Sequence, residues 1–105
     1  MQPSKEIEIR INPNGMIVNS DARTGVRKSD NDTITFRALG SGGPWRIVFL
    51  STSPFASSTF IVPQSGTVNS GPITATYRGT PIKFRYEVQN ADGIVVDDPD
   101  VVVEG

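Results

Sequence analysis

The side chains that could support chemistry in this 105-residue sequence are mainly carboxylates, because histidine and cysteine are both absent. Ser-His-Asp and Cys-His catalysis each need one of those two residue types, so neither can be assembled within this chain. The same absence removes the usual protein ligands of zinc, copper and haem. We therefore predict a protein with no metal and no cofactor.

The densest group of carboxylates lies near the C-terminal end and consists of Asp92, Asp97, Asp98 and Asp100. A calcium ion needs about six to eight oxygen ligands, and this spacing matches no calcium-binding loop, so the sequence favours a solvated turn. Paired carboxylates can also hydrolyse glycosides. However, Glu6, Glu8 and Glu87 fall on strand faces predicted to be wet, and nothing places two of them around a cleft. We predict that the protein is not an enzyme.

Two aromatic residues stand in loop sequences where they could bind a partner. Trp45 is the single tryptophan and follows the glycine-rich stretch 40–44; it either fills the core or forms a platform for a sugar or a peptide. Phe55 lies in a Ser/Thr/Pro-rich stretch, where it is either an exposed contact or an anchor folded back onto the core. The candidate binding residues are Trp45, Arg46, Phe55 and Tyr77.

Charge and hydropathy exclude two classes of partner. The formal net charge is −1, so no basic excess exists to neutralise the phosphates of a nucleic acid, and no polybasic segment exists to attract an anionic membrane. No segment approaches the roughly 20 apolar residues of a membrane span.

The polar start at residues 1–5 is not followed by the apolar run of a signal peptide, so we expect a soluble protein. The compartment stays open: cytoplasmic, or periplasmic or secreted if a signal was removed.

These candidate residues must be positioned by β-strands. Apolar and polar residues alternate over 5–11, 33–38 and 82–88, which is the period of a half-buried strand. Further short strands are predicted at residues 16–18, 45–50, 59–62, 73–77, 94–96 and 101–103. Residues 19–28 are predicted to be a surface connection in which only Val26 touches the core.

Apolar residues do not recur at the three-and-four spacing of a helix over any useful length, and 8 prolines and 10 glycines interrupt the sequence. Asp92-Gly93 is a hairpin signal. The sequence therefore predicts one all-β domain spanning residues 1–105, a Greek-key β-sandwich of cupredoxin-like or immunoglobulin-like type with about seven to eight strands.

Three segments in order resemble the cupredoxins, the blue-copper β-sandwich family. They are Asp32-Thr33-Ile34-Thr35-Phe36, then Gly43-Pro44-Trp45-Arg46-Ile47-Val48-Phe49, then Phe84-Arg85-Tyr86-Glu87-Val88 with the closing Val101-Val102-Val103. The resemblance places the first copper histidine of the family at Trp45, its cysteine at about Val88 and its second histidine at about Ala91. The methionine would fall within 94–96, where there is none. The resemblance thus implies the scaffold of the family without its copper.

Function remains a choice between hypotheses. The first is a non-enzymatic interaction or structural module with an unknown protein partner, bound at a loop end formed by residues 40–45, Phe55 and residues 79–81. The alternative is a carbohydrate-binding module that uses its aromatic loop residues. A third possibility is self-association through an edge strand, for which the apolar residues 101–103 are the candidate.

Overall fold

The computed structural model describes residues 6–18, 23–29 and 31–105. These residues form strands and no helix, which confirms the prediction of an all-β protein. The strands are β1 (Glu6–Ile11), β2 (Arg23–Arg27), β3 (Thr33–Ala38), β4 (Trp45–Phe49), β5 (Thr59–Val62), β6 (Thr67–Asn69), β7 (Ile82–Gln89), β8 (Val95–Asp97) and β9 (Asp100–Glu104). No helix in the described ranges is long and apolar enough to cross a membrane.

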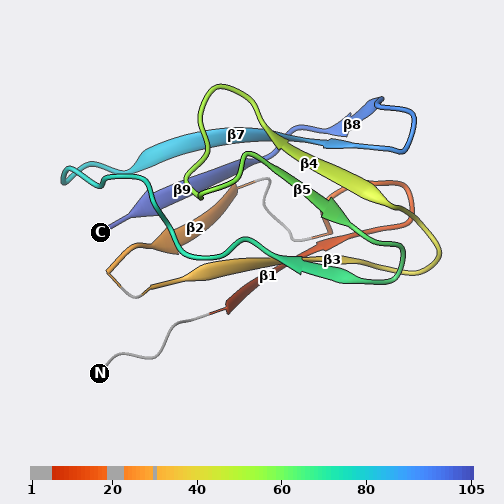
Figure 1. Cartoon of the computed structure of the whole chain (residues 1–105), viewed down its shortest axis with the longest axis horizontal. Helices are drawn as coiled ribbons and strands as arrows, with labels where there is room; N and C mark the ends of the chain where they lie inside the picture. Colours follow the sequence, from red (N-terminus) through yellow and green to blue (C-terminus); the bar gives the residue numbers. More distant parts are fainter. Residues whose placement is uncertain (1–5, 19–22, 30) are drawn as a thin grey trace.

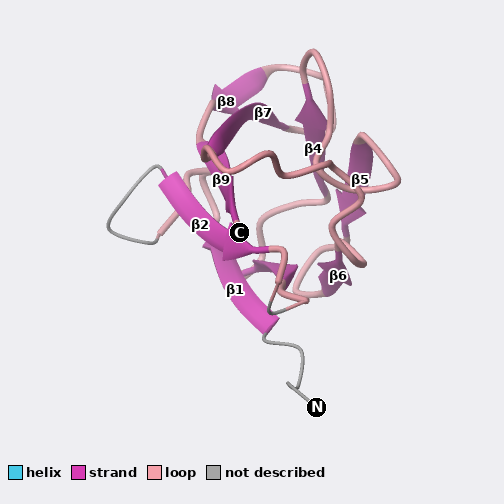
Figure 2. Cartoon of the chain, turned by 90° about the vertical axis from the view of Figure 1, so that its left-hand side faces the viewer, coloured by secondary structure: helices cyan, strands magenta, loops and turns pink. Residues whose placement is uncertain are grey.

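The strands form two sheets that enclose the core, as the layers in Figure 1 and the end-on view in Figure 2 show. The smaller sheet has the order β1-β3-β6, and the larger one has the order β2-β9-β7-β4-β5, with β8 also paired to β7. The pairs β1/β3 and β2/β9 are parallel, and the other pairs are antiparallel. This is the arrangement of a β-sandwich, as the alternating pattern predicts.

The core forms because one face of each long strand is apolar. In β7 the buried residues Phe84, Tyr86 and Val88 alternate with Lys83, Arg85 and the half-buried Glu87, as period two requires. Five rings gather at the centre, with neighbouring centroids 5.1 to 6.4 Å apart: Phe36, Phe49, Phe55, Phe60 and Tyr86. Four of the six contacts are edge-to-face, and such pairs add about 0.5–1.5 kcal/mol each beyond the burial of apolar area.

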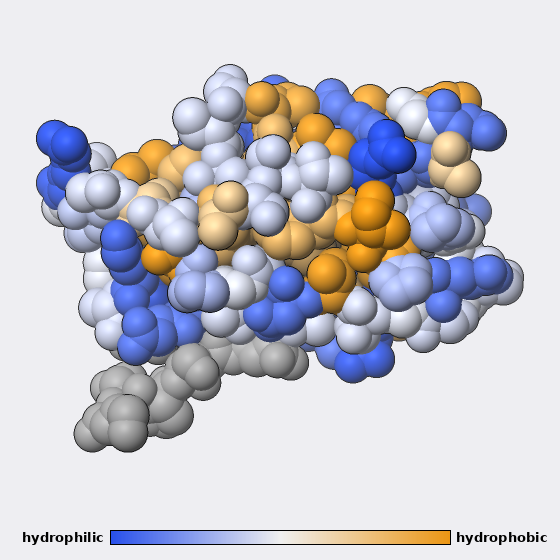
Figure 3. All heavy atoms as spheres, viewed as in Figure 1, coloured by the Kyte–Doolittle hydropathy of each residue, from blue (hydrophilic) through white to orange (hydrophobic). Residues whose placement is uncertain are grey.

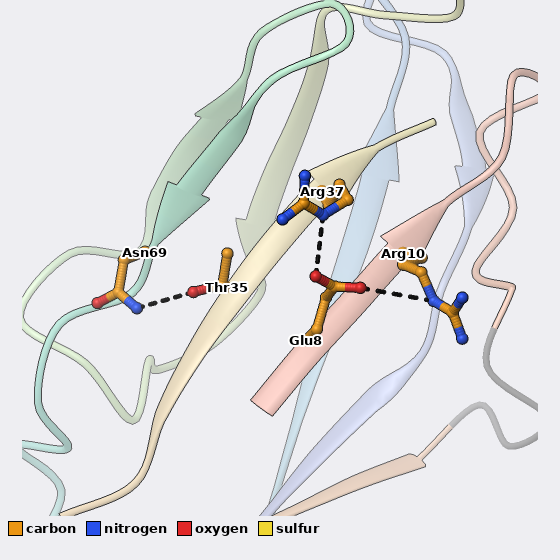
Figure 4. A network of polar contacts seen from close by, with 5 residues as sticks. All are labelled: Glu8, Arg10, Thr35, Arg37 and Asn69. Atoms are coloured by element: carbon orange, nitrogen blue, oxygen red, sulfur yellow. Dashed lines mark hydrogen bonds and ion pairs between the residues drawn. The ribbon is translucent and has the colours of Figure 1, made fainter. Parts of the chain in front are cut away.

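The outer face of the smaller sheet is polar. Glu8 accepts a hydrogen bond from Arg37 Nε at 2.9 Å and also pairs with Arg10, and the Asn69 amide donates to Thr35 Oγ1 at 3.0 Å (Figure 4). Exposed ion pairs such as these contribute little to stability, about 0–1 kcal/mol. The charged side chains of Glu8, Arg10 and Arg37 are exposed on this face.

Two strands, β2 and β6, are not predicted by the pattern of apolar and polar residues. β2 lies within the stretch predicted to be a connection. Only Val26 is buried among its described side chains, so its sequence shows no alternation, and the strand is held by backbone pairing with β9. β6 has three residues, too few for a period to be recognised. With both counted, the described residues have nine strands where about seven to eight were expected.

Two predicted strands are wrong. Residues 73–77 alternate in type but form only one bridge, from Ile73 to Phe55, because the Pro54 carbonyl accepts the N–H groups of both Thr74 and Ala75. Residues 16–18 likewise form only one bridge, from Ile17 to Ile11. Both segments connect sheets and do not extend a ladder.

The expectation that residues 101–103 form an edge is also wrong. They belong to β9, which is bonded to β2 on one side and to β7 on the other. Val101 and Val103 are fully buried. This strand has no free backbone groups with which to pair a second chain.

Candidate functional site

Trp45 closes one end of the sandwich. It is the first residue of β4, and its side chain is only 6% exposed. The six-membered part of its ring packs against Gly15, where a Cβ would overlap Val96 Cγ2 and would lie 2.9 Å from Trp45 Cζ3. Gly15 also has φ +90°, a conformation that other residues rarely adopt. Gly43 lies over the opposite edge, beside the indole Nε1, which is buried and has no hydrogen-bond partner in the described part of the chain.

The loops around Trp45 interlock. A Cβ at Gly42 would lie 2.6 Å from Pro13 Cα, so residues 39–44 and the turn after β1 are in direct backbone contact. From the β5–β6 turn, the Gln64 amide donates to the Ser41 carbonyl and the Ser65 hydroxyl donates to the Gly40 carbonyl. These contacts predict a rigid loop end, which reduces the entropy lost when a partner binds.

The hairpin between β7 and β8 completes this end. Its turn is organised by Asn90, whose side-chain oxygen accepts the N–H groups of Asp92 and Ile94. The Asp97 carboxylate accepts the Ile17 N–H at 2.9 Å, which ties β8 to the segment that follows β1. The hairpin and the loop at residues 12–16 are therefore held together, with Gly15 and Val96 in contact between them.

A shallow depression of about 190 Å³ opens beside Trp45. Its lining consists of Pro44, Trp45, Arg46, Ile61, Asn90 and Ala91. Arg46 of β4 is paired with Ile61 of β5 on one side and with Gln89 of β7 on the other. Gln89 is in turn paired with Val95 of β8. Directly paired residues point to the same face of a sheet, so these four form one row on the outer face of the larger sheet.

Large apolar side chains are concentrated at this end. Six of them are strongly exposed among the described residues: Met16, Val18, Leu50, Ile61, Ile94 and Val95. All but Leu50 belong to the Trp45 end, in the segment after β1, in β5 or in the β7–β8 hairpin. Figure 3 shows apolar colour over β5 and near β8, and further apolar colour at the left-hand end of the view. We call Ile61, Ile94 and Val95, together with Arg46 and Ala91, the rim surface.

The four candidate binding residues do not come together. Arg46 is exposed in the rim surface, and Trp45 lies beneath it. Phe55 is 3% exposed in the central ring cluster. Tyr77 is half-buried against Gly105, near the opposite end.

The loop end expected from the sequence is divided in the same way. β4 runs antiparallel to β7, so residues 40–45 precede β4 at the end where β7 finishes. Residues 79–81 precede β7 and therefore lie at the other end, as do the residues that follow β4. The rim residues Ile61, Ile94 and Val95 were missed, since a single exposed apolar residue in a short strand or a turn carries no sequence signal.

The positions at which the resemblance places copper ligands do lie near one another. Trp45 and Ala91 line the same depression, and Val88 pairs with Ile47, two residues along β4 from Trp45. Ring, methyl and isopropyl groups stand there, and none can bind a metal.

Two of the four aspartates near the C-terminus, Asp97 and Asp100, contact other parts of the protein through their carboxylates. Asp97 accepts backbone N–H groups of Ile17 and Asp98, and Asp100 lies 3.6 Å from Arg85 Nε. Within the described ranges, no group of three or more acidic, histidine or cysteine residues gathers as a metal site would require. Burial raises the pKa of the Tyr86 phenol well above its usual range, and the charges of Asp97 and Asp100 raise it further, so this hydroxyl stays neutral.

Comparison with protein-family models found no matching family, and comparison with curated proteins found no matching relative.

Proposed function

We propose that the protein is a non-enzymatic β-sandwich module that binds another protein through the rim surface. The observation that supports this most strongly is the exposure of large apolar side chains in the rim surface: Ile61, Ile94 and Val95 are three of the six that are strongly exposed among the described residues. Contiguous exposed apolar groups with polar residues around them are typical of protein-binding surfaces.

The chemistry of the rim surface fits a protein partner. Ile61, Ile94 and Val95 supply apolar contacts, and Arg46 supplies a planar, charged donor of a kind enriched at interfaces. The interlocked loops beneath hold these groups in place, so a partner meets a preformed surface.

The architecture we propose is cupredoxin-like with a filled copper position. Its support is the pair of parallel strand pairings, β1/β3 and β2/β9, and the proximity of Trp45, Val88 and Ala91 at one end. In this proposal the indole of Trp45 occupies the region that a metal centre would need, and it stabilises the end of the sandwich by packing. A scaffold reused in this way keeps its fold and loses its chemistry.

The carbohydrate alternative receives no support from the described residues. A sugar stacks on an open aromatic face, whereas Trp45 and Phe55 are 6% and 3% exposed. The depression beside Trp45 is also shallow and small compared with the roughly 300–1,000 Å³ of ligand pockets, which favours a protein partner over a small-molecule substrate.

The test is a binding comparison between two exposed apolar positions. Ile94→Lys places a charge in the rim surface, and Leu50→Lys makes the same change at the opposite end. With immobilised protein and an extract of its own source, we expect the parent and Leu50→Lys to retain the same partner, and Ile94→Lys to bind it at least about tenfold more weakly, since an unpaired charge in an interface core costs well over 1.4 kcal/mol. Equal retention by both variants, or no partner for the parent, contradicts the proposal.

A further inference from the structure

The larger sheet ends in a strand whose outer edge has no partner among the residues that the structure describes. β5 pairs with β4 alone, and the bond from Phe49 N–H to the Ser58 carbonyl fixes the phase of that pairing. In an antiparallel ladder alternate residues bond to the same neighbour. Phe60 and Val62 therefore direct their backbone groups toward β4, while Thr59 and Ile61 direct theirs away from it. No hydrogen bond to the outward groups occurs within the described part of the chain.

β5 also differs from the other edge strands in its chemistry. Its four residues, Thr-Phe-Ile-Val, carry no charge and include no proline or glycine. β1 carries Glu8 and Arg10 on its outer face and is partly covered where Ile17 bridges to Ile11. The sequence of β2 begins and ends with arginine, and β6 and β8 have only three residues each. Charges and short length are the usual protections of an edge, and β5 has only its short length.

We propose that two copies of this chain pair through β5, antiparallel about a two-fold axis at Phe60. The outward N–H and C=O groups of Thr59 in one copy bond those of Ile61 in the other, and the larger sheet continues through both molecules. This register suits a second copy because the strand is self-complementary and uncharged, so no like charges meet on β5. It also places the two Ile61 side chains, each 51% exposed, diagonally across the axis on one face.

The size of the strand sets the strength of the pairing. Four residues bury much less than the roughly 1,200 Å² of a stable interface, so the dimer forms in the micromolar to millimolar range. Ile61 belongs both to β5 and to the rim surface, so partner binding is tested at Ile94 in the β7–β8 hairpin and the pairing is tested at the Thr59 and Ile61 amides. The failure of one proposal can then be told from the failure of the other.

The experiment is sedimentation equilibrium of the full chain up to about 1 mM, with two variants. Ile61→Lys places two ammonium groups across the axis beside Arg46, and Leu50→Lys is the matched control at the other end, at 48% exposure. We expect the parent and Leu50→Lys to dimerise equally and Ile61→Lys to dimerise at least tenfold more weakly, with an unchanged circular dichroism spectrum.

Amide hydrogen exchange then identifies the surface. In the dimer, the Thr59 and Ile61 amides become protected, which a contact made only by side chains would not produce. A monomeric parent at the highest concentration, equal weakening by both variants, or unprotected Thr59 and Ile61 amides in the associated state would each overturn the proposal.

Discussion

Replacing Gly15 by alanine tests whether the packing of Trp45 stabilises its end of the sandwich. Gly15 has φ +90°, and the left-handed region costs a residue with a Cβ about 1–2 kcal/mol. The new methyl group would also overlap Val96 and meet the Trp45 ring at 2.9 Å. Overpacking of this kind costs about 1–3 kcal/mol more. We expect Gly15→Ala to lower the free energy of unfolding by about 2–5 kcal/mol.

Gly79→Ala is the matched control. Gly79 has φ +89°, almost the same backbone conformation, but no atom of the other described residues lies within 4 Å of its Cβ position, its two chain neighbours aside. It should therefore lose only the backbone term, about 1–2 kcal/mol. Urea denaturation followed by the fluorescence of Trp45 measures both variants, and the difference between them isolates the packing term. If the two variants lose the same stability, Gly15 does not pack tightly against Trp45, and the proposed structural role of this contact is wrong.

Three other outcomes are expected. The emission of Trp45 is blue-shifted and protected from acrylamide in the native protein; a fully quenchable, water-like emission contradicts its burial. Asp97→Ala costs about 1.5–3 kcal/mol, measured by urea denaturation, because the N–H groups of Ile17 and Asp98 lose a charged acceptor; a loss below about 0.5 kcal/mol contradicts this role. Tyr86 has a raised native pKa, so its stability contribution is complete below the unfolded value of about 10 and declines as the pH rises above it. The stability of the parent relative to Tyr86→Phe should therefore fall by about 1.4 kcal/mol per pH unit above pH 10, and a constant difference contradicts the shift.

The sequence predicts the elements whose two faces differ. The alternation in residues 82–88 corresponds to β7, and Asp92-Gly93 lies in the turn between β7 and β8, with Gly93 at φ +81°. β2 could not be predicted in this way. It borders only one strand, and among its described side chains only Val26 is buried. Its sequence therefore looks like that of an exposed segment, although its backbone is paired in a sheet.

The candidate site was harder to predict, because burial depends on contacts between distant segments. Phe55 lies among serine, threonine and proline residues, which are typical of an exposed loop. It is buried against Phe49 and Phe60, and its segment is joined to residues about twenty positions along the chain, where Phe55 bridges to Ile73 and the Pro54 carbonyl accepts the Thr74 N–H. The rim surface likewise combines single residues from β4, β5 and a hairpin, and no local pattern reveals it.

The strand order of the larger sheet underlies both proposals, and amide hydrogen exchange on dilute protein tests it most directly. With β5 at the edge, the amides of Thr59 and Ile61 should exchange quickly and those of Phe60 and Val62 slowly. With β9 between β2 and β7, all amides of residues 101–103 should be protected. Uniform protection along β5, combined with alternating exchange in residues 101–103, would contradict this order.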